Sequence, residues 1–140
     1  MQIFDYQIFK SQPINKIDSN YPIPTVLLEE VFFLKLISKD GIVGYGEPSP
    51  YIVDKKLFLN LFFDIIENYI INRKITTILQ NLNKIKVNKS LIIYSNIITA
   101  SLEQALNDIL AKESSLPLYK FLNKKNLKKQ NKISIYSSGG

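Results

Sequence analysis

The sequence of 140 residues contains no cysteine and no histidine. Without cysteine, the chain cannot form disulfides, thiolate metal sites or a cysteine nucleophile. Without histidine, it lacks the commonest metal ligand and the usual general base of serine and cysteine hydrolases. Any acid–base chemistry would therefore fall to Asp, Glu, Lys or Tyr side chains.

Arginine is nearly absent, because the eighteen cationic side chains are seventeen lysines and Arg73. The charge is uneven: residues 1–70 carry a net charge of −3 and residues 71–140 carry +9. A basic half can bind a polyanion. Base recognition, however, favours the forked guanidinium group of arginine, and only Arg73 could supply one. The excess of lysine therefore indicates a general bias in amino-acid composition rather than a selected binding face. Nucleic-acid binding is the least favoured of the functions considered.

Long hydrophobic runs are also missing. The most apolar region, residues 57–71, is interrupted by Asn60, Asp64, Glu67 and Asn68, so it is too short and too polar to span a bilayer. The N-terminus lacks the basic start and apolar centre of a signal peptide. We therefore expect a soluble cytoplasmic protein that does not enter a membrane. Its 46% of hydrophobic residues suffices for the core of one domain.

The first half of the chain has the pattern of a small antiparallel sheet. Alternation predicts strands over residues 2–12, 31–38 and 42–47. Asp40-Gly41 predicts a tight turn before the third strand, and Pro48 ends that strand because proline cannot donate to a ladder. In the first strand, three residues should share one face: Phe4, Tyr6 and Ile8.

A proline-rich segment separates the first two predicted strands. It contains Pro13, Pro22 and Pro24 among Asn, Asp and Ser residues. This composition predicts a long loop, and loops of that length in compact domains are often functional.

The second half is predicted to be helical. Asp54 should cap a helix that runs to about residue 72, and further helices are expected over residues 76–86 and 97–113. A Ser-Ser-Leu-Pro sequence ends the last of these, and Leu118–Leu122 is expected to form a short apolar turn. The first helix has a wide apolar stripe made of Leu57, Leu61, Ile65, Phe58, Phe62, Ile66 and Tyr69. The predicted fold is α+β, with a three-stranded antiparallel meander followed by a bundle of three to four helices.

Two segments, in this order, resemble a known family. GIVGYGEP (residues 41–48) resembles the G-x-x-G-x-G-E hairpin of the mandelate racemase and muconate-lactonising branch of the enolase superfamily. ASLEQALNDILAKESSLPLYKFL (residues 100–122) is similar to the helix and exit of the same N-terminal capping domain. ISIYS (residues 133–137) resembles the first strand of the barrel that follows this cap. The sequence departs from the family pattern at Asn107, Ala111, Ser115 and Asn123-Lys124.

The resemblance implies a capping domain over residues 1–122, then a linker and the start of a barrel strand over residues 123–140. In the family, a (β/α) barrel holds Mg²⁺ and the catalytic bases, and the reaction begins by abstracting a proton α to a carboxylate. A barrel needs about 200 residues or more, so we expect these 140 residues to lack it and to be inactive alone. The implied partners are that C-terminal barrel, a small carboxylate substrate and further copies of the same enzyme. No metal or catalytic residue is expected in this chain.

The resemblance also implies roles for named residues. Two loops should cover the substrate, and their residues are Tyr21, Pro22, Ile23, Pro24 and Thr25 in the first, and Ser49, Pro50, Tyr51 and Ile52 in the second. A second set is expected to be structural, namely Gly44, Gly46, Glu47, Asp108, Lys112 and Pro117. Gly44 and Gly46 leave one strand face bare, so another backbone can approach closely. Asp108 and Lys112 form an i,i+4 pair, and Lys112 should neutralise the end of its helix.

Glu47 raises an alternative, because a carboxylate beside two glycines could also be catalytic. We favour the structural role at a strand end. A different class of function is also open, in which the chain is a stand-alone interaction module descended from the cap. The nucleotide sequence beyond Gly140 distinguishes these two readings.

Overall fold

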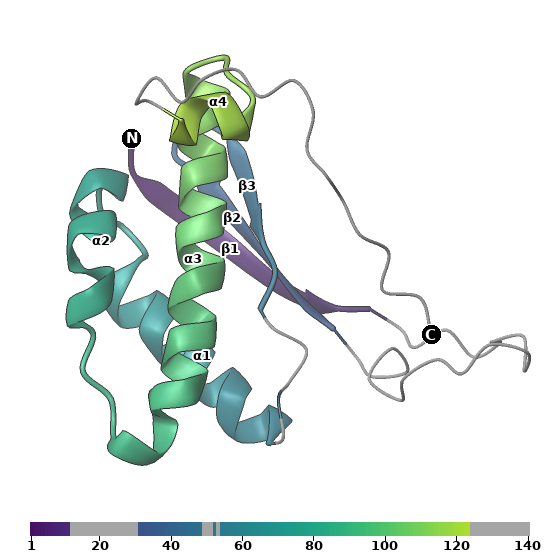
Figure 1. Ribbon diagram of the computed structural model, residues 1–140, viewed down its shortest axis with the longest axis vertical. Helices are drawn as coiled ribbons and strands as arrows, with labels where there is room; N and C mark the ends of the chain where they lie inside the picture. The colour runs from purple at the N-terminus through teal and green to yellow at the C-terminus, as the bar shows by residue number, and fades with distance from the viewer. Residues whose placement is uncertain (12–30, 49–51, 53, 124–140) are drawn as a thin grey trace, which may run out of the picture.

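A three-stranded antiparallel sheet opens the fold in the computed structural model, which describes residues 1–11, 31–48, 52 and 54–123 (Figure 1). Its strands are β1 (Ile3–Lys10), β2 (Phe32–Ser38) and β3 (Val43–Gly46), in the order β1-β2-β3. Helices follow the sheet along the chain, so the predicted α+β class and meander are confirmed.

The turn between β2 and β3 follows from Gly41. Its φ of +79° lies in the left-handed region, which glycine adopts without a Cβ clash. The Gly41 N–H donates to the Ser38 carbonyl at 2.9 Å, and the Ile42 N–H donates to the Ser38 hydroxyl at 3.1 Å. The hairpin predicted from Asp40-Gly41 is therefore present.

The predicted face of β1 is wrong at Phe4. The register against β2 shifts between Ile3 and Asp5, as in a β-bulge, so Ile3 is buried and Phe4 is 65% exposed. Tyr6 and Ile8 do share the inner face, opposite Leu36 and Leu34 of β2. The extra residue at the bulge breaks the alternation on which the prediction relied.

Ile3 is held by a distant segment, which accounts for the position of the bulge. The Ile3 N–H donates to the Arg73 carbonyl at 3.1 Å, and the Asn72 N–H donates to the Ile3 carbonyl at 2.9 Å. Gln2 also bridges Lys74. The outer edge of β1 is thus paired at its N-terminal end by residues that sequence alternation cannot reveal.

Helix α1 (Lys55–Tyr69) begins as predicted, because the Asp54 carboxylate accepts from the Leu57 N–H at 2.9 Å. Its apolar stripe is narrower than expected. The buried side chains are Phe58, Phe62, Ile65 and Ile66, whereas Leu57 and Tyr69 at the two ends are exposed.

The next helices differ from the prediction at their ends. Helix α2 (Ile75–Asn81) passes into a 3₁₀ turn, η2 (Leu82–Lys84), before reaching residue 86. Helix α3 (Ile92–Glu113) follows η3 (Lys89–Leu91) and begins five residues before the predicted start at Ile97. No side chain caps this start, so the sequence carries no signal for it.

Helix α3 ends in a Schellman motif. The Leu116 N–H donates to the Ala111 carbonyl at 2.9 Å, and the Ser115 N–H donates to the Lys112 carbonyl at 3.0 Å. Ser115 takes a φ of +52° there. Leu118–Leu122 then forms a short helix, α4, rather than the predicted turn.

The helices pack on one face of the sheet, with α3 running along β3 (Figure 1). The inner residues of β2, Phe32, Leu34 and Leu36, are buried with the apolar side chains of α1 and α3. Phe58 lies at the centre of this core and contacts the rings of Phe32, Phe62 and Tyr94. Among the described residues, no helix is both long enough and apolar enough to cross a membrane.

Candidate functional site

The predicted glycines of β3 lie against the backbone of α3. A Cβ added at Gly44 would stand 2.1 Å from the Ala105 carbonyl oxygen, and one added at Gly46 would stand 2.0 Å from the Ser101 carbonyl oxygen. Neither position can hold a side chain unless α3 moves away. The backbone that approaches the bare strand face is therefore that of α3.

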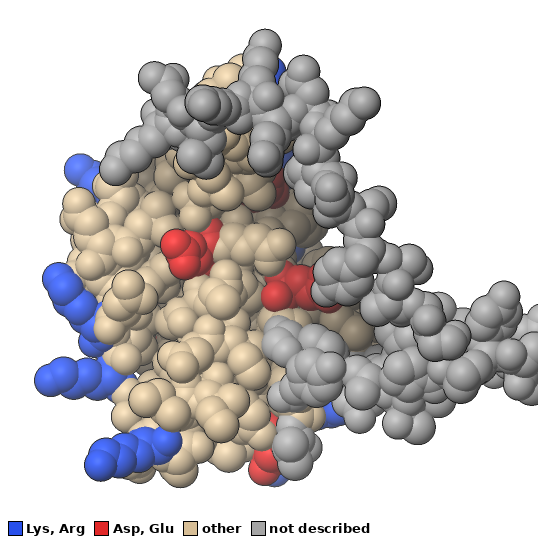
Figure 2. All heavy atoms as spheres, viewed as in Figure 1, with Lys and Arg blue, Asp and Glu red and all other residues tan. Residues whose placement is uncertain are grey.

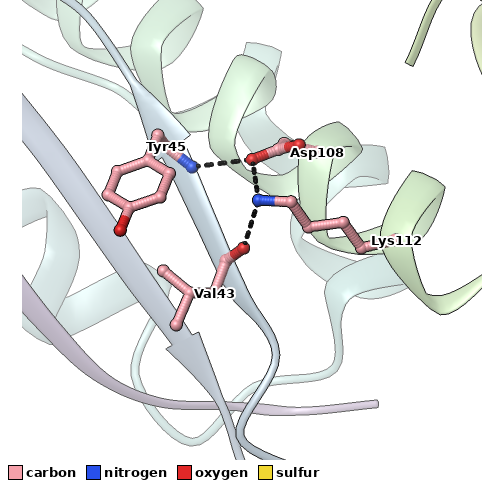
Figure 3. Close-up of polar contacts among 4 residues, drawn as sticks. All are labelled: Val43, Tyr45, Asp108 and Lys112. Carbon is pink, nitrogen blue, oxygen red and sulfur yellow. Dashed lines mark hydrogen bonds and ion pairs between the residues drawn. The ribbon is translucent and has the colours of Figure 1, made fainter. Parts of the chain in front are cut away.

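A row of polar side chains on α3 binds the outer edge of β3 (Figure 3). Lys112 Nζ donates to the Val43 carbonyl at 2.8 Å, and Asp108 Oδ2 accepts from the Tyr45 N–H at 3.1 Å. Asp108 and Lys112 also form an ion pair at 2.7 Å, which confirms the predicted i,i+4 pair. We call this arrangement, together with the two glycine contacts, the β3–α3 seam.

Gln104 completes the row one helical turn earlier. Its Oε1 atom accepts from the Glu47 N–H at 2.9 Å. Gln104 was not among the predicted residues, although its spacing of four and eight residues from Asp108 and Lys112 places all three on one helix face. That spacing is the signal that could have identified it.

The structure thus gathers most of the predicted structural set in one place. Gly44, Gly46, Asp108 and Lys112 meet in the seam, whereas Pro117 lies beyond it and precedes α4. Lys112 reaches across to β3 instead of only covering the end of its own helix, as was expected. Glu47 contributes its backbone N–H, and its side chain is exposed.

The predicted substrate-covering residues are only partly within the described structure. Tyr21, Pro22, Ile23, Pro24, Thr25, Ser49, Pro50 and Tyr51 all lie outside it. Ile52 is described, and its side chain is buried in the hydrophobic core. Ile52 therefore differs from the ligand-facing position that was expected for it.

Side chains of α3 hold the backbone on both sides of residues 49–52. Gln104 accepts from the Glu47 N–H, and the Tyr94 hydroxyl accepts from the Asp54 N–H at 2.8 Å. The Tyr94 ring is fixed in turn by an edge-on contact with Phe58, with centroids 5.8 Å apart. Tyr94 was not predicted, because it lies before the helix that was expected over residues 97–113, whereas α3 begins at Ile92.

A hollow of about 440 Å³ lies where β1 ends and α1 begins. Its lining includes the side chains of Lys10, Phe32, Lys56 and Phe63. Because β2 and β3 are antiparallel, this is also the end of the sheet at which Gly46 and Glu47 lie. The hollow therefore lies at the end of the sheet where β1 and β3 end and β2 begins.

Charged side chains are scattered over the face of the molecule that Figure 2 shows. On the face seen in Figure 2, the blue side chains of the described residues stand apart along the edge near α2 and the start of α3. They do not form a continuous basic patch on this face. Within the described ranges, no group of three or more Asp or Glu side chains could hold a metal ion.

The family is shown by comparison with known proteins. The profile of the mandelate racemase / muconate lactonizing enzyme N-terminal domain matches residues 7–123. A search of the curated proteins finds no match.

Solved structures share the fold at low sequence identity. A mandelate racemase/muconate lactonizing enzyme from Sulfitobacter sp. matches with a TM-score of 0.67 and 18% identity, over 87% of this chain and 30% of that one. A muconate cycloisomerase from Azorhizobium caulinodans gives 0.58 and 22%, over 90% and 31% of the two chains. An enolase from Agrobacterium radiobacter, bound to Na and L-malate, gives 0.58 and 22%, over 87% and 28%.

The chain spans about 30% of the length of the solved structures that it matches. Its matched region, residues 7–123, contains every described strand and helix apart from the first residues of β1. On the family match and the shared fold, this chain belongs to the mandelate racemase/muconate lactonizing enzyme N-terminal domain family, within the enolase superfamily.

Proposed function

We propose that this chain is the substrate-capping domain of an enolase-superfamily enzyme. The observation that carries the proposal is the family match over residues 7–123. In such an enzyme a C-terminal barrel would bind Mg²⁺, which stabilises an enediolate formed from a small carboxylate substrate. The present chain would supply no catalytic group.

The proposed contribution of this chain is to cover and select the substrate. Residues 21–25 and 49–51 would form the two covering segments, and the buried Ile52 is left out of the second. The bonds from Gln104 to Glu47 and from Tyr94 to Asp54 support this role, because they anchor the backbone on either side of the second segment. The domain boundary at residue 122, assembly into a homo-oligomer and a cytoplasmic location stay predictions.

The first test is an assay of the purified chain. With Mg²⁺ present, we expect no exchange of the α-proton for deuterium in acid sugars or dipeptides, as followed by NMR. The muconate cycloisomerase from Azorhizobium caulinodans, with its own substrate, would serve as the positive control. Exchange catalysed by this chain alone would contradict the assignment of all chemistry to a barrel.

The second test examines the covering segments in an enzyme in which this domain is joined to a barrel. Replacing Tyr21 or Tyr51 by alanine should change the ratio of kcat/KM between two carboxylate substrates, because these side chains would contact the variable part of the substrate. Unchanged ratios for both variants would contradict the proposal. If the gene encodes no barrel beyond codon 140, the interaction module becomes the better explanation.

A further inference from the structure

The outer edge of β3 is a potential site of strand pairing. β3 pairs with β2 on one side only, through contacts such as Leu36 with Gly44. In an antiparallel strand the N–H and C=O groups of alternate residues point to the same side. Val43, Tyr45 and Glu47 therefore direct their backbone groups away from β2, and within the part of the chain that the structure describes no further strand pairs with them.

The three side chains of the seam occupy this edge in order. Lys112 binds the Val43 carbonyl, Asp108 binds the Tyr45 N–H, and Gln104 binds the Glu47 N–H, with lengths of 2.8, 3.1 and 2.9 Å. Each step moves back four residues along α3 and forward two residues along β3. Four helical residues rise about 6.0 Å and two strand residues about 6.7 Å, so the two repeats nearly coincide.

The glycine contacts repeat with the same period. Ser101 and Ala105, four residues apart on α3, lie against Gly46 and Gly44, two residues apart on β3. Contact between the backbones brings α3 close enough for its polar side chains to reach around the strand. The two glycines of β3 and the polar bonds to its outer edge therefore depend on each other, because both require α3 to lie close to the strand.

We propose that Gln104, Asp108 and Lys112 act as a substitute for a fourth strand, and that they prevent β3 from pairing with β3 of a second copy of this chain. Exposed strand edges otherwise act as templates for pairing between chains. β3 contains no proline, and its outer-face side chains, Val43 and Tyr45, are uncharged. The residues of β3 themselves therefore do little to oppose pairing with β3 of a second copy.

The opposite edge of the sheet gives a useful contrast. Its first residues are paired by backbone, through Ile3 with Asn72 and Arg73. Asp5 then covers the following N–H group, because its Oδ1 atom accepts from the Tyr6 N–H at 2.7 Å. Self-association caused by removing the α3 side chains should therefore proceed through β3 rather than β1. This inference does not depend on the proposed capping function.

The test is a triple variant, Gln104→Ala with Asp108→Ala and Lys112→Ala, compared with wild type by sedimentation velocity over a range of concentrations. Alanine preserves helix propensity, so α3 should persist. We expect the variant to self-associate about tenfold more tightly, since each dimer gains interchain hydrogen bonds that were blocked before. Amide exchange at Tyr45 and Glu47 should slow as the concentration of the variant rises.

A matched control removes the same chemical groups elsewhere, as Asn107→Ala with Glu103→Ala and Lys120→Ala, and should leave self-association unchanged. Adding Tyr45→Lys to the first triple variant should return self-association to the wild-type level, because like charges facing each other across a strand pair repel. If the triple variant fails to fold, Asp108→Ala alone, with folding checked by circular dichroism, replaces it. A folded variant that associates no more than wild type, or one whose association survives Tyr45→Lys, would overturn the proposal.

Discussion

Tyr6 carries a hydroxyl group whose acidity is changed by the fold. Burial, together with the 2.7 Å hydrogen bond that Tyr6 donates to Glu67, raises its pKa from 10.0 to about 12. The folded state thus favours the neutral phenol. This contribution to stability is complete below pH of about 10, the unfolded pKa, and is lost as the pH rises through about 12.

We therefore predict that the free energy of unfolding of Tyr6→Phe depends less on pH than that of wild type between about pH 9 and 12. Urea unfolding at several pH values would measure this difference. Tyr119→Phe is the control, because Tyr119 is 67% exposed and its variant should keep the wild-type slope. Equal slopes for wild type and Tyr6→Phe would contradict the prediction.

Ser115 occupies a position that favours glycine. Its φ of +52° is in the left-handed region, which glycine adopts without a Cβ clash. For a residue with a Cβ this conformation costs about 1–2 kcal/mol, whereas glycine loses about 0.4–1 kcal/mol more chain entropy on folding. Ser115→Gly should therefore raise the free energy of unfolding by about 0.5–1 kcal/mol.

The matched control for this prediction is Ser114→Gly. Ser114 has a φ of −79°, so glycine there relieves no strain and should only destabilise. Both variants can be compared by chemical denaturation. A destabilised Ser115→Gly would show that the serine makes a compensating interaction at the end of α3.

At the scale of elements, the packing of β3 on α3 depends on the absence of a Cβ atom at Gly44 and at Gly46. A Cβ at Gly46 would overlap the Ser101 carbonyl, which is part of a helix and cannot turn aside. We predict that Gly46→Ala lowers the free energy of unfolding by about 3 kcal/mol, or prevents folding, because the whole of α3 must shift.

Gly41→Asn is the comparison for this variant. A Cβ at Gly41 meets no atom within 4 Å, and asparagine tolerates the positive φ of +79°. Its effect in chemical denaturation should be much smaller. If Gly46→Ala were as stable as Gly41→Asn, the close approach of α3 to β3 would not be required for folding.

Much of this arrangement could be predicted from local patterns. The turn at Asp40-Gly41, the bare face of Gly44 and Gly46, and the pairing of Asp108 with Lys112 each depend on residues near one another in sequence. The bulge at Phe4 could not be predicted, because it depends on contacts of Ile3 with residues about 70 positions away. The contact of Tyr94 was missed for the same reason, since its partner Asp54 is 40 residues away in the sequence, whereas Gln104 could have been found from its spacing to Asp108 and Lys112.

At the scale of the whole molecule, the net charge of +6 invites a test of nucleic-acid binding. The ammonium groups of the lysines are point charges and lack the paired N–H donors with which arginine recognises bases. The guanidinium group of Arg73 already donates to the Asn68 carbonyl at 3.1 Å. We predict only weak, non-specific binding to duplex DNA, which falls steeply between about 50 and 200 mM salt.

Fluorescence anisotropy with two unrelated duplexes would measure this binding. Equal affinities for both duplexes, lost at the higher salt, are the expected result. Binding that persists at physiological salt and discriminates between the duplexes would show that the basic half of the chain is a selected recognition surface.

The matched repeats of α3 and β3 also restrict which changes of length the gene can tolerate. One residue inserted between Ser101 and Lys112 would turn the following side chains by about 100° around the helix axis and move them off the strand. The contacts before the insertion, such as that of Ser101 with Gly46, and those after it, such as that of Lys112 with Val43, could then no longer form in one register. We expect insertions and deletions among natural homologues to avoid residues 101–112 and to collect instead in the connection between α2 and α3.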